Sequence, residues 1–218
     1  MRKRFPIWLF ATAGLNTLVL ALSGGWGNPW LWAYCVVWSA TITYGVLGID
    51  ADLARERFNP PTRGADRAAL GFIRLLGLTH LVVGALDAGR WHLTVPVPST
   101  IRGAALVGMG ISMWVVFRSM HENRYFSSVV RVQHDRGHQV VETGPYALVR
   151  HPGYAGMLAA MPFSGLAMGS WVGFAIALGY SVLIIRRVLF EDAFLQRHLN
   201  GYTAYAQRVT HRLIPGTW

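Results

Sequence analysis

The sequence has little cysteine, little lysine and little charge of any kind, and each shortage excludes a class of protein. Its 218 residues contain one cysteine, Cys35, inside an apolar run, which excludes a disulfide framework and a cysteine-based zinc site. Charged residues make up 14% of the chain, against about a quarter in soluble domains, which argues against a soluble protein. Hydrophobic residues reach 53%, without a glycine period of three or sustained heptads, so disorder, collagen and coiled coil are excluded.

The charges that are present are mostly positive. Nineteen Arg and one Lys, Lys3, oppose ten acidic residues and give a formal net charge of +10. A basic excess of this size indicates a nucleic acid or an anionic membrane surface as a partner. The positions of the arginines along the chain decide between these two partners.

Long uncharged runs recur along the chain, and each is close to the roughly 20 helical residues that cross a bilayer. The last run, Gly153 to Ile185, has no charge in 33 residues and would extend about 50 Å as one helix, against a hydrocarbon core of about 30 Å. It must therefore fold back, with a bend near Gly169 and Ser170. We expect an all-α integral membrane protein of about six transmembrane helices, the last two forming a helical hairpin; the earlier runs are Phe5–Leu22, Pro29–Ile49, Ala69–Ala88 and the segment between Arg102 and Arg118.

Three glycines punctuate the predicted hairpin at intervals of four residues: Gly165, Gly169 and Gly173. This spacing is typical of helices that approach closely through small side chains. The same glycines could instead only form the turn. The sequence leaves both interpretations open.

Six crossings predict that most of the basic residues share one side of the membrane. The opposite loops hold only Arg90 and Arg102. By the positive-inside rule, both termini lie in the cytoplasm, and the charge reflects topology and lipid contact. A nucleic-acid partner is therefore not expected. The start of the chain also resembles a signal peptide, but its apolar run is longer than a usual signal core, which favours a retained helix. The basic segments are 1–4, 50–68, 119–152 and 186–218.

Two polar segments interrupt the membrane pattern. The first, 50–67, predicts a turn and an interfacial helix that form a solvated connection. The second, 119–152, is too long for a simple hairpin loop, and such loops are usually functional or disordered. Its many valines need burial, which argues against disorder. We therefore divide the chain into N-terminal transmembrane helices, 1–118, and a catalytic region, 119–218, within one structural domain.

The second polar segment ends in an Arg-His-Pro sequence directly before the last apolar run. Pro152 suits the first turn of a helix, where its missing N–H costs nothing. Arg150 and His151 would then lie at a helix entrance, which favours an anionic group such as a carboxylate. Beyond the hairpin, Arg187 and Glu191 are four residues apart, which by default is a surface ion pair. Together these residues predict a polar pocket roofed by Tyr146, Tyr154, Tyr202 and Tyr205.

These motifs together resemble the membrane methyltransferases of the isoprenylcysteine carboxyl methyltransferase and phospholipid methyltransferase superfamily. The resemblance covers about the last hundred residues, while residues 1–100 look like the variable helical part of bacterial members, which implies a bacterial inner membrane. The family usually shows two consecutive glutamates after the hairpin, whereas here the second acid is Asp192, whose role is left open. The motifs are Asn123–Ser127, Gly144–Tyr146, Arg150–Tyr154, Glu191–Asp192, Tyr202, Tyr205 and Arg212–Gly216.

The resemblance implies S-adenosyl-L-methionine as methyl donor and a lipophilic or lipid acceptor that carries a carboxylate, amine or thiol, with isoprenylcysteine-like carboxyl methylation as one candidate. The long loop, the motif helix and the C-terminal tail would form the donor pocket on the cytoplasmic side. Catalytic candidates are Arg187, Glu191 and, on the acceptor side, Asn123. The implied donor-binding residues are Gly144, Pro145, Tyr146, Val149, Arg150, His151, Pro152, Tyr154, Glu191, Tyr202 and Tyr205.

Three other interpretations compete with this one. A nicotinamide-dependent reductase of the sterol-reductase type shares part of the C-terminal architecture, and a non-catalytic membrane protein also fits six helices. His134 and His138 have a spacing that could bind metal, but no further ligand is evident and no metal is expected. His80 lies in an apolar run, where a helix-packing hydrogen bond is favoured over a proton relay with Asp87.

Overall fold

The computed structural model describes residues 8–61 and 64–218, and within them the protein is helical, without strands. This confirms the all-α prediction; the basic start at 1–4 lies outside the described residues. The α-helices are α2 (Leu15–Ser23), α3 (Pro29–Gly48), α4 (Ala51–Phe58), α5 (Arg67–Leu86), α6 (Ser99–Glu122), α7 (Pro152–Met168), α8 (Trp171–His198) and α9 (Tyr202–Arg208). The shorter helical segments are η1 (Phe10–Gly14), η2 (Asp87–Trp91), η3 (His134–Arg136) and η4 (Gly144–Ala147).

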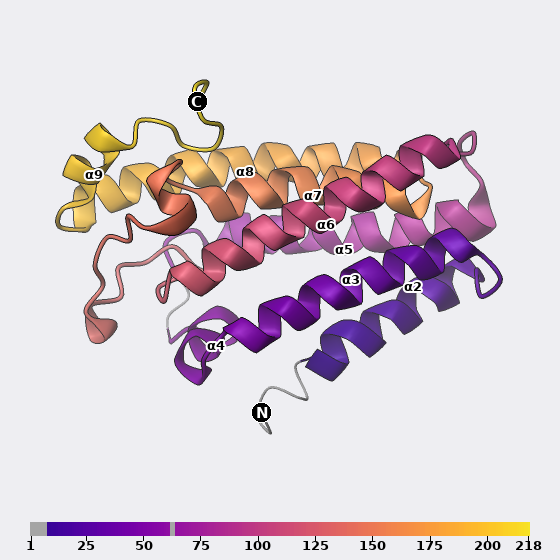
Figure 1. The fold of residues 1–218 in the computed structure, drawn as a ribbon, viewed down its shortest axis with the longest axis horizontal. Coiled ribbons are helices and arrows are strands. Elements are labelled where there is room, and N and C mark those ends of the chain that lie inside the picture. Colours follow the sequence, from indigo (N-terminus) through magenta and orange to yellow (C-terminus); the bar gives the residue numbers. More distant parts are fainter. Residues whose placement is uncertain (1–7, 62–63) are drawn as a thin grey trace.

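The long helices lie side by side, and the long loop, α4, α9 and the C-terminus gather at one end of the bundle (Figure 1). Helix α7 packs against α6 and α8, and α5 packs against α8. Four described helical stretches are long and apolar enough to cross a membrane: Pro29–Gly48, Ala68–Trp91, Ser99–Glu122 and Trp171–His198. Helices α2 and α7 are shorter, so the exact number of crossings stays a prediction. The chain is a membrane protein.

The predicted hairpin is confirmed, and its turn explains where both helices stop. Gly169 adopts a φ of +99°, a conformation that L side chains rarely adopt, and it ends α7. Ser170 then caps α8 by accepting a hydrogen bond from the backbone N–H of Gly173 at 2.8 Å. The bend lies where the sequence places it.

The hairpin glycines serve both of the predicted purposes. A Cβ at Gly165 would lie 2.4 Å from the backbone nitrogen of Phe174, so only glycine allows α7 and α8 to approach this closely. A Cβ at Gly173 would lie 3.1 Å from the Cα of Gly84 on α5. Gly169 makes the turn, whereas Gly165 and Gly173 allow helix contact.

The two arginines predicted on the far side both bind carbonyls at helix ends. Arg90 donates to the carbonyls of Ala21 and Leu22 at the end of α2, at 3.0 and 2.7 Å. Arg102 donates to the carbonyl of Met168 at the end of α7, at 2.9 Å. Both therefore donate to carbonyls in the last turn of a helix, where intrahelical N–H partners run out. Their end of the bundle is opposite the long loop (Figure 1), as the predicted topology requires.

The segment 50–67 does form the predicted short helix, α4, but the prediction of a solvated connection is wrong. Leu53 and Glu56 on α4 are buried. Glu56 accepts hydrogen bonds from Ser127 at 2.6 Å and from Arg131 at 2.7 Å, both in the long loop. Helix α4 is thus a support for that loop, because its buried carboxylate fixes two loop side chains.

Candidate functional site

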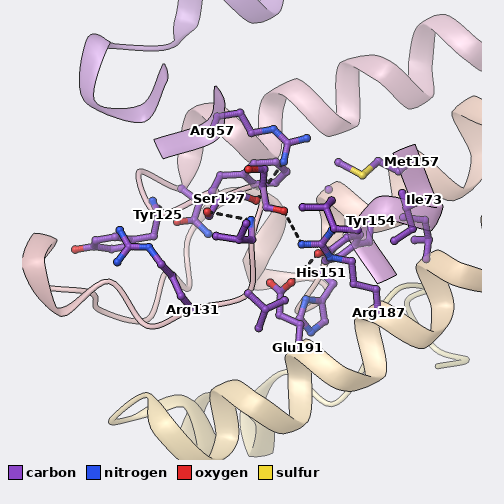
Figure 2. Close-up of a pocket in the computed structure, with 18 of the residues that line it drawn as sticks. Arg57, Ile73, Tyr125, Ser127, Arg131, His151, Tyr154, Met157, Arg187 and Glu191 are labelled. Atoms are coloured by element: carbon purple, nitrogen blue, oxygen red, sulfur yellow. Dashed lines mark hydrogen bonds between the residues drawn. The ribbon is translucent and has the colours of Figure 1, made fainter. Parts of the chain in front are cut away.

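A cavity of about 510 Å³ lies where the long loop meets α5, α7 and α8. This is within the roughly 300–1,000 Å³ that small-molecule sites occupy. Figure 2 shows Arg187 and Glu191 projecting from α8 toward His151 and Tyr154, with Arg57 on the opposite wall. Charged groups from three separate parts of the chain therefore meet around one cavity.

Arg187 lies in the cavity wall, but its ion-pair partner differs from the predicted one. Its Nη2 lies 2.9 Å from Asp66 at the start of α5 and donates to the Ser128 carbonyl at 2.7 Å. The expected surface pair with Glu191 is wrong, because Arg187 is 7% exposed and turns toward the loop and α5. Its Nε and the Ser128 hydroxyl, both buried, have no hydrogen-bond partner among the described residues. The wall therefore presents unused polar groups.

Glu191 borders the cavity beside the motif helix. The Tyr154 hydroxyl donates to Glu191 Oε2 at 2.6 Å, and both side chains line the cavity. The guanidinium carbon of Arg187 lies 5.9 Å from the centre of the Tyr154 ring, a cation–π distance. Tyr154 thus contacts both the cation and the carboxylate.

Asp192, the acid whose role the sequence left open, is the centre of a buried cluster beside the cavity. Its two oxygens accept from Arg150 Nε and Nη2 at 2.8 and 3.0 Å, and Arg212 Nε donates at 3.0 Å. His151 Nε2 lies 3.1 Å from Asp192, and the Tyr202 hydroxyl and Gln196 Nε2 each donate to it at 3.0 Å. The cluster joins the motif, α8, α9 and the C-terminal tail.

Arg150 and His151 sit at the entrance of α7 as predicted, but much of their hydrogen-bonding capacity is used within the protein. Arg150 Nη1 donates to the carbonyls of Val209 and Thr210 at 2.7 and 2.8 Å, in addition to its contacts with Asp192. The backbone N–H groups of Arg150 and His151 donate to the tail carbonyls of His211 and Arg212 at 3.0 and 2.9 Å. The tail is thereby held against the motif.

Asn123 and the tyrosines form the loop side of the cavity. Asn123 ends α6 and donates from Nδ2 to the Tyr146 hydroxyl at 3.3 Å. Tyr205 donates from its hydroxyl to the Tyr146 carbonyl at 2.7 Å. Burial raises the pKa of the Tyr146 phenol, so it stays protonated at neutral pH. The loop wall therefore presents neutral oxygen and nitrogen atoms.

The structure brings most of the predicted site residues to the cavity and keeps four away from it. Gly144 adopts a φ of +58° beside the Glu122 side chain, and Pro145 follows it in η4. Val149 is buried, and Pro152 is in the first turn of α7. These four shape the backbone, and their predicted donor contacts remain predictions. The predicted residues that line the cavity are Asn123, Tyr146, Arg150, His151, Tyr154, Arg187, Glu191, Tyr202 and Tyr205.

Sequence analysis missed the contribution of the segment before α5. Arg57 on α4 lines the cavity, donates to the Ser127 carbonyl at 3.1 Å and lies 5.3 Å from the centre of the Phe126 ring. Burial lowers the pKa of Arg57. Asp66, the partner of Arg187, was missed as well. The alternation of acids and arginines in this short amphipathic helix was the available signal, because one of its faces must be buried.

Comparison with known proteins agrees with this geometry. The model of the phospholipid methyltransferase family matches residues 99–201. A probable protein-S-isoprenylcysteine O-methyltransferase of Oryza sativa subsp. indica is 31% identical over 90 residues, which is 39% of this chain and 46% of the relative. Protein-S-isoprenylcysteine O-methyltransferase B of Arabidopsis thaliana is 26% identical over 91 residues, 39% of this chain and 45% of the relative.

The alignments therefore span less than half the length of these curated relatives. The matched segment begins with α6, includes the long loop, the motif and the hairpin, and ends just before α9. It contains Asn123, Arg150, Arg187 and Glu191, so the matched segment supplies a large part of the cavity lining. Residues 99–201 are therefore similar to the phospholipid methyltransferase family, and about 90 residues of the chain are similar to isoprenylcysteine O-methyltransferases.

Proposed function

We propose that this protein is an S-adenosyl-L-methionine-dependent methyltransferase that acts on a lipophilic acceptor within the membrane. The single observation that carries the proposal is the coincidence of the matched segment with a cavity lined by Arg187, Glu191 and Tyr154. The cavity continues from the polar loop down between the helices, so an apolar molecule and a polar one can meet there. By the positive-inside argument, the loop end faces the cytoplasm of a bacterial inner membrane.

The residues present fit the chemistry of this donor. S-adenosyl-L-methionine carries a carboxylate, an ammonium and a sulfonium, so its site needs an acid, N–H donors and aromatic or oxygen-rich walls. Glu191 supplies the acid, and one of its oxygens is held by Tyr154. The first turn of α7 supplies N–H groups at a positive helix end, beside His151. Asn123 and Tyr146 supply polar wall atoms.

When bound, the donor supplies a methyl carbon already activated by sulfonium, and the methyl–sulfur bond breaks as the acceptor atom forms its bond to that carbon. The protein must align the two molecules and exclude water, which can contribute several kcal/mol. Glu191 would hold the donor ammonium, and Arg187, one turn earlier on α8, would orient the acceptor. Tyr154 contacts both residues, Glu191 through its hydroxyl and Arg187 through its ring.

The charges of the cavity wall favour an acceptor with a carboxylate over one with an amine. Arg57 and Arg187 face the cavity, and Arg74 also lines it, whereas Glu191 is the acid that lines it among the described residues. Arg187 keeps a buried Nε–H that has no hydrogen-bond partner among the described residues, and a carboxylate oxygen would satisfy it. We therefore propose carboxyl O-methylation, which is compatible with the O-methyltransferase names of the Oryza and Arabidopsis relatives.

The site draws on both parts of the chain. The predicted catalytic region, 119–218, supplies the loop, the motif and α8. Arg57 and Asp66 come from the part before residue 118 and complete the wall. We propose that the catalytic region requires α4 and the start of α5, because Asp66 fixes Arg187.

Titration calorimetry on the purified full-length protein tests the function. We expect S-adenosyl-L-methionine and S-adenosylhomocysteine to bind, and NADPH not to bind. Binding of NADPH without either sulfur compound would instead favour a membrane reductase, and absence of all binding would favour a non-catalytic protein. If Arg187→Ala and Glu191→Ala both kept full methyl transfer to a prenylated cysteine analogue, the residue assignments would be wrong.

A further inference from the structure

The inner end of the cavity, far from the charged loop, holds a second group of polar side chains. Tyr34 of α3, His80 of α5 and Ser164 of α7 all line the cavity and are 1%, 1% and 6% exposed. The Tyr34 and Ser164 hydroxyls lie 2.9 Å apart, and Ser164 Oγ lies 3.1 Å from His80 Nε2. Such a group is costly in a membrane interior unless it is hydrogen-bonded or functional.

The hydrogen-bond directions in this group follow from one contact. His80 Nδ1 lies 2.8 Å from the Gly173 carbonyl, which can only accept, so Nδ1 carries the proton. His80 Nε2 is then an acceptor, and the Ser164 hydroxyl must donate to it. Because Ser164 has a single proton, the Tyr34 hydroxyl donates to Ser164. The resulting chain runs from Tyr34 through Ser164 and His80 to the Gly173 carbonyl, which confirms a helix-packing role for His80.

This chain uses every polar proton of the three side chains. The capacity that remains consists of lone pairs on the Tyr34 and Ser164 oxygens. A ligand that reaches them gains a hydrogen bond only if it brings a donor of its own. In a low-dielectric interior, a neutral hydroxyl can donate without the desolvation cost of an ammonium.

The cavity has the length for a ligand that touches both ends. Ser164 is thirteen residues beyond His151 on α7, or about 20 Å at 1.5 Å per residue. Between these ends most of the lining is apolar, with Ile73 and Met157 at the loop end (Figure 2), and Arg74 and Tyr180 are the polar exceptions on α5 and α8. At Gly77 an added Cβ would meet Tyr180 and Met161 at ordinary distances of 3.9 and 4.0 Å. A larger side chain there would block the passage.

We propose that the inner end of the cavity binds a hydroxyl group at the far end of an elongated lipophilic molecule whose anionic head lies near Arg187. The Tyr34 and Ser164 oxygens accept the hydroxyl proton, so this end selects hydroxylated chains over unmodified ones. That this molecule is the methyl acceptor rests on the proposed function. The hydroxyl subsite itself rests on the geometry of Tyr34, Ser164 and His80.

Three probes that share the same carboxylate head and the same hydrocarbon chain test the proposal: palmitic acid, ω-hydroxypalmitic acid and ω-methoxypalmitic acid. Their extended length is about 20 Å, by the rise per bond of an extended chain. With the purified full-length protein, we expect the hydroxy acid to bind about 3–10-fold more tightly than palmitic acid, the gain of one net hydrogen bond. The methoxy acid, which cannot donate, should bind no more tightly than palmitic acid.

Variants assign this preference to named atoms. The double variant Tyr34→Phe with Ser164→Ala should lose the preference for the hydroxy acid. Tyr44→Phe, the same change on the same helix outside the cavity lining, should keep it. In Ser164→Ala alone, the Tyr34 hydroxyl loses its acceptor and becomes free to donate. The methoxy acid, whose ether oxygen can accept this hydrogen bond, should then gain affinity. Gly77→Leu should weaken all three probes at least tenfold, whereas Gly77→Ala should not.

The affinities of the wild-type protein for the three acids can by themselves overturn the proposal. Equal affinities for the three acids, a preference for the methoxy acid, or no binding by any of them would each do so. Titration of S-adenosylhomocysteine on the same preparation tests the proposed function separately. A hydroxyl preference without binding of that compound would leave a lipid-binding subsite and refute the methyltransferase, and the reverse result would refute only the subsite.

Discussion

Two consecutive acids on α8, Glu191 and Asp192, have opposite surroundings. Asp192 is 1% exposed and is bound by two arginines, a histidine, a tyrosine and Gln196, so both of its oxygens are fully used. Glu191 borders the cavity and has one described hydrogen bond, from Tyr154. Asp192 therefore belongs to a buried structural cluster, whereas its neighbour Glu191 belongs to the cavity wall.

The difference teaches that unused hydrogen-bonding capacity marks a site better than charge does. The cluster around Asp192 gathers charged groups around one carboxylate, yet these groups bind one another. In the part of the chain that the structure describes, the wall leaves Arg187 Nε and the Ser128 hydroxyl without hydrogen-bond partners. Buried polar groups normally find partners, so those that lack them are arranged for something else.

The largest expected effect tests the structural side of this comparison. Asp192→Asn removes the charge that pairs with Arg150 and Arg212 while keeping the shape of the side chain. Because it leaves buried cations without a counter-charge, we expect a loss of about 3–5 kcal/mol of folding stability. Thermal unfolding in detergent measures it. Glu191→Gln is the matched control and should lose less than about 1 kcal/mol; equal losses would remove the distinction between the two acids.

The second prediction tests the cavity side. Glu191→Gln keeps the size of the side chain and its acceptor oxygen for Tyr154, but it removes the negative charge. If the carboxylate holds the donor ammonium, affinity for S-adenosylhomocysteine should fall about 10–100-fold, the loss of one charge-assisted hydrogen bond. Calorimetry gives the affinity, and the unfolding temperature should hardly change. A variant that loses stability but keeps its affinity would assign Glu191 to the fold instead.

The sequence predicts the local features of the site better than the contacts between distant segments. The helix-entrance motif and the hairpin are local features, because Pro152 and Gly169 restrict the backbone wherever they occur. The pairing of Arg187 with Asp66 joins residues far apart in the chain, and no spacing rule reaches that far. The four-residue interval to Glu191 offered a local partner instead, and this misled the prediction.

The same limit explains why α4 was underrated. Its acids and arginines have the composition of a solvated connection, and its burial depends on the loop that folds over it. Burial opposes ionisation of Glu56, but Arg131 and Ser127 hold the pKa of its carboxyl below the ordinary value. Composition cannot show a partner that arrives from residue 131.

The third prediction concerns the loop wall and pH. His138 lines the cavity, and burial together with Arg131 and Arg136 lowers its pKa to about 4. The folded protein therefore keeps the imidazole neutral, whereas the unfolded chain protonates it near its ordinary pKa of about 6.5. Stability from this group is fully present above pH about 6.5 and is lost as the pH falls toward 4.

Because His138 is partly exposed, we expect this loss to be about 1–2 kcal/mol, less than full burial would give. His138→Phe keeps a ring against Tyr125, whose centre lies 4.3 Å from the histidine ring. The unfolding temperature of the variant should fall less steeply than that of the wild type between pH 6.5 and 4.5. Parallel curves for the two proteins would show that His138 does not titrate in this way.

The fourth prediction has the smallest expected effect. It tests whether burial or ion pairing itself explains why the Asp192 cluster stabilises the fold. Glu142 and Arg208 form a carboxylate–guanidinium ion pair, the same type of pair as in the Asp192 cluster, with the two charged atoms 2.5 Å apart. Their side chains, however, are 42% and 57% exposed. Water and salt screen such a pair, so Glu142→Gln should change the unfolding free energy by less than about 0.5 kcal/mol and leave donor affinity unchanged. A loss as large as that of Asp192→Asn would mean that ion pairing alone, whatever its burial, holds the tail to the motif. The expected near-zero result instead assigns the stability of that contact to the low-dielectric surroundings of Asp192.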